Sequence, residues 1–142
     1  MSFKKLKIRI KQNEGFSIKP YKDQLGFFTI GYGHLIKNSE KKYFNNFYSK
    51  NHFEEVFEDD FNIAYNEYIK KFYVKQHKNN EKELLIEMIF QLGSTGVSKF
   101  NKMLYYLNNN QKYMACLEMI DSLWYRQTPK RVENLMSNFL SK

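Results

Sequence analysis

The sequence predicts an α+β fold in which a small antiparallel sheet near the N-terminus is followed by a long run of helices. Two observations predict it. Four of the six glycines fall within residues 15–33, which indicates a segment rich in turns. After this segment, apolar residues recur at three- and four-residue spacing, which is typical of helices. The length of 142 residues fits one compact domain.

The N-terminal elements follow from local patterns. Residues 3–13 form the pattern of a short helix, which Gly15 can end in a left-handed conformation. Residues 27–30 (Phe-Phe-Thr-Ile) favour a strand, they are bounded by glycines on both sides, and residues 23–26 indicate a turn. We therefore expect two or three antiparallel strands within residues 16–36.

The helical part begins with a long helix. Apolar residues at helical spacing predict it over residues 53–72, and twenty helical residues span about 30 Å. Thr128 and Pro129 provide an N-cap and a first-turn proline for the last helix. The remaining expected helices are residues 81–92, 97–107, 111–123 and 130–140.

These elements predict a single domain, residues 1–142, with two lobes. Residues 16–52 are expected to form the β lobe, and residues 1–15 and 53–142 a helical lobe that includes the connecting helix. A cleft is expected between them.

The net charge of the chain limits the classes of binding partner that we expect. A formal net charge of +8 favours polyanionic partners, namely nucleic acid, an anionic membrane face or a phosphate-rich bacterial envelope. The sequence has no zinc-finger motif, no RNP-like strand and no basic helix free of acids, so we do not predict nucleic-acid binding. Anionic surfaces of the cell envelope remain.

The sequence gives little support for a disulfide, a metal or cofactor site, or a membrane-spanning segment. Cys116 is the single cysteine, so no internal disulfide can form, and we expect it to be buried. The three histidines lack a metal-ligand spacing, and we predict neither a metal site nor a cofactor. No apolar run approaches the ~20 residues of a membrane span, and none is typical of a signal peptide. We expect synthesis in the cytoplasm and a separate route to any target outside it.

Two carboxylates are the candidate catalytic groups. Glu14 lies at the predicted helix end and Asp23 lies nine positions later at a turn, while Thr29 follows on a strand. Inverting hydrolysis of a glycosidic bond uses one carboxylic acid and one carboxylate about 6.5–9.5 Å apart. The negative helix terminus favours a protonated Glu14, whereas Asp23 beside Lys22 is expected to ionise. As isolated residues, the two acids are better explained as a solvated helix residue and an ordinary turn aspartate.

Three sequence blocks resemble one family. Residues 14–35 are similar to the catalytic signature of the bacteriophage lysozymes, glycoside hydrolase family 24, with T-even phage type endolysins among its members. The other blocks resemble the family's central helix with its following turn and its C-terminal cleft segment. They are Phe90-Gln91-Leu92-Gly93 with Thr95-Gly96-Val97 and Phe100, and Trp124-Tyr125-Arg126-Gln127-Thr128-Pro129-Lys130-Arg131.

The resemblance implies a lysozyme-like fold and an activity. Glu14 is implied as the general acid, Asp23 as the second carboxylate and Thr29 as the group that orients water. The implied reaction is inverting hydrolysis of the β-1,4 bond between N-acetylmuramic acid and N-acetylglucosamine in peptidoglycan. A monomeric endolysin is implied, which accumulates in the host cytoplasm and lyses the host after another protein opens the membrane.

The resemblance also implies substrate contacts. Arg131 matches an arginine that approaches the catalytic glutamate, which would favour its ionised form. T-even phage members present serine and asparagine where this chain has Met103 and Glu118, and their segment between positions 34 and 57 is longer. The implied cleft residues are Leu35, Phe90, Gln91, Gln127 and Thr128.

Two residues and two alternatives remain. Asp60 lies on an apolar helix stripe, so we expect a structural pairing with His34. Trp124 is equally well explained as core or as a sugar contact. Binding of glycan without cleavage, and a lytic transglycosylase that leaves 1,6-anhydro ends, are the alternatives to hydrolysis.

Overall fold

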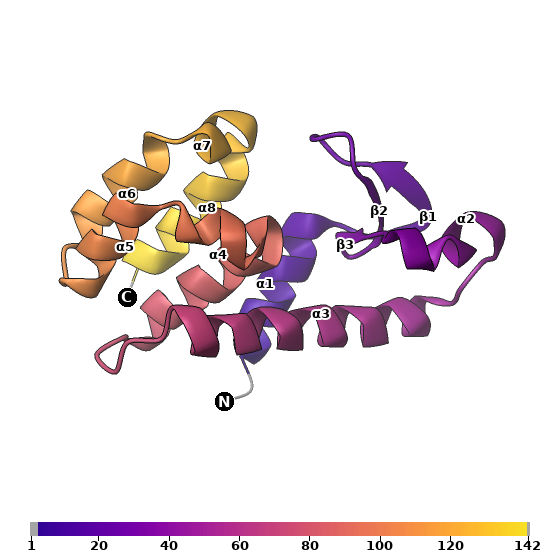
Figure 1. Cartoon of the computed structure of the whole chain (residues 1–142), viewed down its shortest axis with the longest axis horizontal. Helices are drawn as coiled ribbons and strands as arrows, with labels where there is room; N and C mark the ends of the chain where they lie inside the picture. The colour runs from indigo at the N-terminus through magenta and orange to yellow at the C-terminus, as the bar shows by residue number, and fades with distance from the viewer. Residues whose placement is uncertain (1–2, 142) are drawn as a thin grey trace. The chain divides into compact units, whose positions relative to one another are not determined.

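The computed structural model describes residues 3–141 and confirms the α+β class (Figure 1). Its contacts divide the chain into two compact units, Met1–Ile63 and Ala64–Lys142. The first unit contains a three-stranded antiparallel sheet in the order β1-β2-β3. Contacts group the N-terminal helix with this sheet, and the lobe boundaries expected from the sequence stay a prediction.

The first unit is built from short elements and the start of one long helix. Helix α3 (Lys50–Lys71) begins here and continues into the second unit. The preceding elements are α1 (Lys4–Glu14), β1 (Ser17–Lys22), β2 (Phe28–Gly31), β3 (His34–Leu35), the 3-10 turn η1 (Asn38–Glu40) and α2 (Lys42–Asn45).

The sheet register assigns side chains to two faces, because directly opposed residues point to the same side. The first face carries Tyr21, opposite Thr29, and Thr29 is in turn opposite Leu35. The other face carries two opposed pairs: Lys22 with Phe28, and Ile30 with His34.

The second face packs on an aromatic core. Ile30, Tyr43 of α2 and Phe53 of α3 form one buried cluster. Gly31 lies against the Phe53 ring, since a Cβ atom at this position would be 2.8 Å from Phe53 Cδ1. Its φ of 65° is also in the left-handed region, so both packing and backbone favour glycine here.

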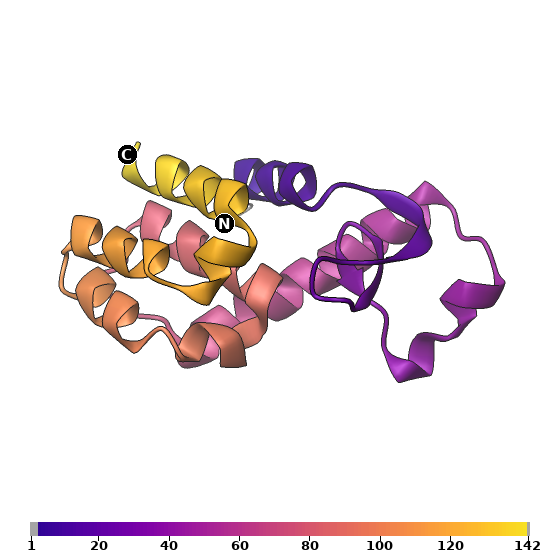
Figure 2. The same ribbon diagram turned by 90° about the horizontal axis from the view of Figure 1, so that it is seen from above.

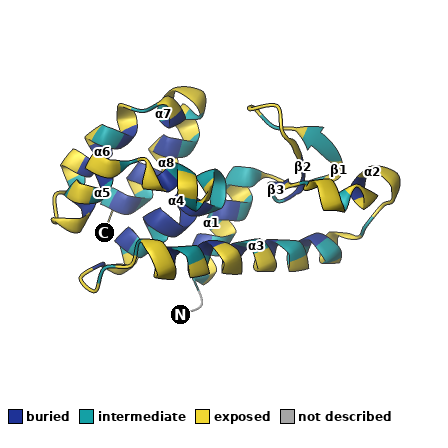
Figure 3. Cartoon of the chain, in the orientation of Figure 1, coloured by how far each residue is buried: buried dark blue, intermediate teal, exposed yellow. Residues whose placement is uncertain are grey.

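The second unit is helical around an aliphatic and methionine core. Residues 84–89 of α4 are all buried (Figure 3). Helix α5 packs against α6, and α8 packs against α4, α6 and α7 (Figure 2). The helices are α4 (Asn79–Ser98), α5 (Asn101–Asn108), α6 (Lys112–Ile120), α7 (Leu123–Gln127) and α8 (Pro129–Leu140).

Two segments that were each predicted as one continuous helix are interrupted in the structure. The helix expected over 97–107 is interrupted, because α4 ends at Ser98 and α5 starts at Asn101. The helix expected over 111–123 ends at Ile120. Helix α7 follows, and its N-cap residue Ser122 accepts a hydrogen bond through Oγ from the Tyr125 N–H at 3.1 Å. Apolar spacing continued through both breaks, so periodicity alone did not reveal them.

The expected cap of the last helix was also partly wrong. Thr128 occupies the N-cap position and Pro129 begins α8, as predicted. However, the Thr128 side chain caps no N–H group and instead donates back to Trp124 O at 3.1 Å.

None of the described helices combines the length and apolar character needed to cross a membrane.

Candidate active site

Glu14 is the last residue of α1 and is half-buried. Gly15 ends the helix with φ 73°, and its N–H donates to Lys11 O at 2.9 Å, which confirms the predicted helix end. The side chain of Glu14 therefore leaves α1 where the chain turns toward β1.

The Glu14 carboxyl group lies against the β2–β3 turn. A Cβ atom at Gly33 would lie 2.7 Å from Glu14 Cδ, closer than real side chains approach. Gly33 also has φ 74°, in the left-handed region. Glycine at position 33 thus makes room for the carboxyl group.

Asp23 is fixed at the start of the β1–β2 hairpin. Its Oδ1 atom accepts hydrogen bonds from the N–H groups of Leu25 and Phe27, both at 2.9 Å. Its own N–H donates to Phe27 O at 2.9 Å. Both side-chain bonds end on Oδ1, so the carboxylate is oriented without using Oδ2.

Tyr21 connects the surroundings of the two acids. Burial raises the pKa of its hydroxyl, and the negative charges of Glu14 and then Asp23 raise this pKa further. Both carboxylates therefore contribute to the electrostatic environment of this one phenol. Thr29 lies opposite Tyr21, is buried with 4% of its surface exposed, and donates its hydroxyl to Phe27 O at 3.1 Å.

A polar network holds the end of α1 to α3. Lys11 Nζ contacts Glu54 Oε2 at 2.5 Å, and Tyr32 donates its hydroxyl to Glu54 Oε1 at 2.7 Å. Burial, this hydrogen bond and the charge of Glu54 raise the pKa of Tyr32 to about 12. Because Tyr32 precedes Gly33, the network fixes the turn against which Glu14 lies.

A second network involves His34. Its Nδ1 atom lies 2.7 Å from Asp60 Oδ2, which confirms the expected pairing, and its Nε2 atom lies 3.0 Å from Glu40 Oε1. Burial lowers the pKa of His34, but the hydrogen bonds and charges of Asp60 and Glu40 outweigh it, so the pKa is raised. The sequence pattern did not indicate Glu40.

In the second unit, two of the predicted substrate residues form one cluster. Gln91 Nε2 donates to Thr128 Oγ1 at 3.4 Å, and Gln91 Oε1 accepts from Trp124 Nε1 at 3.1 Å. Trp124 is 5% exposed, so the structure favours a core role for its ring. The amide of Gln91 is thereby oriented by two neighbours.

The other predicted residues have different surroundings. Arg131 Nε lies 3.5 Å from Oε2 of the fully buried Glu87, while an approach to Glu14 stays a prediction. Phe90 is half-buried and Gln127 is exposed, and in the first unit Leu35 is 52% exposed. Beyond these, Met103 belongs to the core with 1% exposure, Glu118 is half-exposed, and Cys116 is buried as expected.

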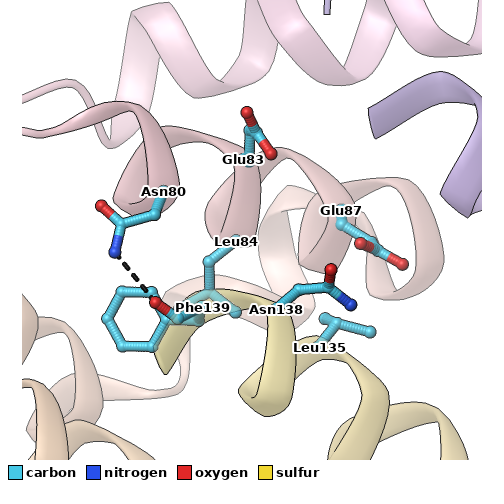
Figure 4. Close-up of a pocket in the computed structure, with 7 residues that line it drawn as sticks. All are labelled: Asn80, Glu83, Leu84, Glu87, Leu135, Asn138 and Phe139. Atoms are coloured by element: carbon cyan, nitrogen blue, oxygen red, sulfur yellow. Dashed lines mark hydrogen bonds between the residues drawn. The ribbon is translucent and has the colours of Figure 1, made fainter. Parts of the chain in front are cut away.

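A hollow lies between α4 and α8 (Figure 4). None of the predicted substrate-binding residues lines it, so we do not assign it to the active site. Its walls are Asn80, Glu83, Leu84, Glu87, Leu135, Asn138 and Phe139. Within residues 3–141, no group of three histidine, cysteine or acidic side chains is arranged to hold a metal ion.

Comparison with known proteins decides the family. The family model for phage lysozyme matches residues 11–138. The chain belongs to the phage lysozyme family. It is therefore a lysozyme, a glycoside hydrolase that acts on bacterial peptidoglycan.

Similar proteins occur both in Dictyostelium discoideum and in Enterobacteria phage T4. Probable T4-type lysozymes 2 and 1 of Dictyostelium discoideum are 32% and 30% identical to this lysozyme. The alignments cover 94% and 93% of the chain, and 92% and 91% of those proteins. The pre-baseplate central spike protein Gp5 of Enterobacteria phage T4 is 30% identical over 89% of the chain, which corresponds to 26% of that protein.

Some residues around the candidate site were not predicted from the sequence. Tyr21, Gly33 and the pair Tyr32 and Glu54 were not predicted as site residues. The glycine at position 33 is a usable signal, because glycine marks a position where the backbone or a neighbouring group leaves no place for a side chain. No local pattern indicates that Glu54, 22 positions away, accepts from Tyr32.

Proposed function

We propose that this lysozyme hydrolyses peptidoglycan with inversion, with Glu14 as general acid and Asp23 as general base. The bond cleaved is the β-1,4 linkage from N-acetylmuramic acid to N-acetylglucosamine. The observation that carries the proposal is the shared environment of the two acids, since both charges act on Tyr21 while Gly33 makes room for Glu14.

In the proposed reaction, one water adds as one glycosidic bond breaks. Asp23 takes a proton from the water, whose oxygen bonds to the anomeric carbon on the face opposite the leaving sugar. The C–O bond breaks, and its electron pair accepts the proton of Glu14. The Asp23 hydrogen bonds on Oδ1 support this role, because they orient the carboxylate and leave Oδ2 for the water.

Thr29 is proposed to orient that water. Its hydroxyl hydrogen is donated to Phe27 O, so the remaining lone pair of Oγ1 can accept a hydrogen bond from water. Tyr21 lies directly opposite on the same sheet face, and the charges of both acids raise the pKa of its hydroxyl.

The substrate contacts remain proposals within each unit. In the first unit, the exposed Leu35 shares the sheet face of Thr29. In the second unit, the oriented amide of Gln91 supports a role in hydrogen bonding to sugar. The other proposed contacts there are Phe90, Gln127, Thr128 and Arg131.

We propose a monomeric endolysin that is made in the host cytoplasm and lyses the host once another protein opens the membrane. Its net charge of +8 favours the anionic envelope, so lysis of whole cells should weaken as salt screens this attraction. Lysis that is independent of ionic strength would contradict this role of charge.

The test compares wild type with Glu14→Gln and Asp23→Asn on purified peptidoglycan. Each variant should lose about 10²–10⁴-fold in the rate of reducing-end formation. Asp59→Asn, at an exposed acid of the same unit, is the matched control and should keep its activity.

Product chemistry separates the alternatives. NMR of the first product should show the anomer opposite to the substrate, and mass spectrometry should show addition of one water. A 1,6-anhydro product would establish a transglycosylase. Wall binding without new reducing ends would establish a binding protein.

A further inference from the structure

Exposed aromatic and lysine side chains gather beside the sheet face that carries Lys22 and Phe28, which is the face that does not carry Thr29. Figure 3 shows most of α2 as exposed, and two of these aromatic side chains lie on or after this helix. We call the group the aromatic–lysine patch. Its members, all exposed, are Lys22, Phe28, Lys41, Lys42, Phe44 and Phe47.

Contacts join Lys22, Phe28 and Phe44 into one surface. Lys22 is opposite Phe28 in the sheet and its Nζ lies 5.3 Å from the ring centroid. The Phe28 ring meets the Phe44 ring edge-on, with centroids 5.2 Å apart. Lys41 precedes Phe44 by three residues, a spacing that places side chains on the same side of a helical turn.

The three phenylalanines of the patch leave much of their apolar surface exposed. Phe28, Phe44 and Phe47 are 44%, 47% and 78% exposed. Scattered exposed apolar residues are common, but Phe28 and Phe44 are in contact and have lysine neighbours, which is typical of an interaction site.

The charge around the patch is positive. Residues 16–50 contain six lysines and two acids. Both acids have other partners, since Asp23 accepts from hairpin N–H groups and Glu40 contacts His34 and the Lys37 N–H. The patch lysines therefore favour an anionic partner.

We propose that the aromatic–lysine patch binds the surface of an anionic phospholipid bilayer. Phenylalanine rings can enter the boundary between headgroups and acyl chains, while long lysine side chains keep their ammonium groups at the lipid phosphates. A glycan partner fits less well, because the charged groups of the patch are all flexible lysines, which offer sugar hydroxyls no acceptor.

This binding is distinct from the proposed hydrolysis. The patch lies on or beside the face of Lys22 and Phe28, whereas Tyr21, Thr29 and Leu35 share the other face. Peripheral binding through the patch would hold the enzyme at a membrane while the face with Thr29 stays free.

Vesicle flotation with the full chain tests the proposal. Wild type should float with vesicles of equal phosphatidylglycerol and phosphatidylcholine at low salt, and should not float with phosphatidylcholine alone. Removing one lysine should weaken partitioning about five-fold, so Lys41→Gln/Lys42→Gln should weaken it about 25-fold. Phe47→Ser should weaken it by about ten-fold through lost apolar burial.

Control variants make the result specific. Lys99→Gln/Lys102→Gln removes two exposed lysines of the second unit and should retain more than half of wild-type partitioning. Phe47 is 78% exposed, so its variant should keep the wild-type circular dichroism spectrum and melting temperature. These outcomes would support the proposal.

Three results would overturn it: no flotation of wild type, equal losses in the patch and control variants, or patch variants that lose peptidoglycan binding but still float. Failure of the proposed catalytic mechanism is distinguishable, because Glu14→Gln should abolish hydrolysis while flotation stays at the wild-type level.

Discussion

In the first unit, charged and hydrogen-bonded side chains join the elements around a small aromatic core, whereas in the second unit a larger aliphatic core joins the helices. Helix α3 supplies Glu54 and Asp60 to the polar networks of the first unit. In the second unit, Leu85, Ile86 and Met88 of α4 are all fully buried.

This difference teaches how each unit should respond to change. A unit joined by ionisable groups should be sensitive to pH and to single polar substitutions. A unit joined by close-packed apolar groups should be sensitive mainly to changes of side-chain volume. The candidate catalytic acids lie in the first kind of unit.

The largest expected effect is loss of core volume in the second unit. Leu85→Ala should lower the free energy of unfolding by about 2–5 kcal/mol, because a fully buried leucine leaves a cavity. Fluorescence of Trp124, the single tryptophan, during urea unfolding measures this unit. Leu117→Ala, at a residue 55% exposed, should change stability by less than about 0.5 kcal/mol.

Gly33→Ala should lower turnover about 10²-fold, since the new methyl group would displace the Glu14 carboxyl group and small misplacements of catalytic groups are costly. It should also destabilise the fold by about 1–3 kcal/mol, because φ is 74°. Gly93→Ala has a similar φ of 78° but meets no atom within 4 Å, so it should share the loss of stability and retain turnover. Equal turnover in the two variants would refute the role of Gly33.

Asp60→Asn should lower the free energy of unfolding by about 1–3 kcal/mol, because the buried His34 ring loses the negative charge that contacts its Nδ1 atom. Turnover at a temperature where the variant is folded should stay near the wild-type rate. Asp59→Asn, at the exposed neighbouring acid, should change neither quantity. Loss of activity in fully folded Asp60→Asn would show that the pairing also serves catalysis.

The pH dependence of stability should reveal His34. Its pKa is raised above the ordinary 6.5 in the folded state, so folding takes up a proton between 6.5 and the raised value. The stabilisation is complete below pH 6.5 and is lost as pH rises through the folded pKa. Urea unfolding from pH 5.5 to 9 should show this decrease, with a smaller slope in Asp60→Asn than in wild type.

The smallest effect should come from Tyr32→Phe. Removing the hydroxyl group deletes its hydrogen bond to Glu54 and should cost about 1 kcal/mol. Tyr105→Phe, at a residue 60% exposed, is the control and should be neutral within about 0.5 kcal/mol. Equal thermal unfolding of both variants would show that the Lys11 and Glu54 pair holds α1 without Tyr32.

Much of the fold and the identity of the candidate acids could be predicted from sequence. The glycine cluster indicated the hairpin and turns, and apolar periodicity indicated the long helix, because both signals arise from neighbouring residues. The motif around Glu14 and Asp23 resembled one family closely enough to name the enzyme class. Thr29 on a strand and Asp60 opposite His34 were also expected.

Only the tertiary structure decided how these parts meet. The helices break at residues 99–100 and after Ile120, although the apolar pattern continues through both breaks. The Thr128 hydroxyl donates to Trp124 O, although its position predicts a cap of α8. The hydrogen bond of Tyr32 to Glu54 and the contact of Glu14 with Gly33 join residues 22 and 19 positions apart. Local sequence fixes backbone preferences within a few residues, whereas the surroundings of each acid depend on which distant side chains folding brings beside it.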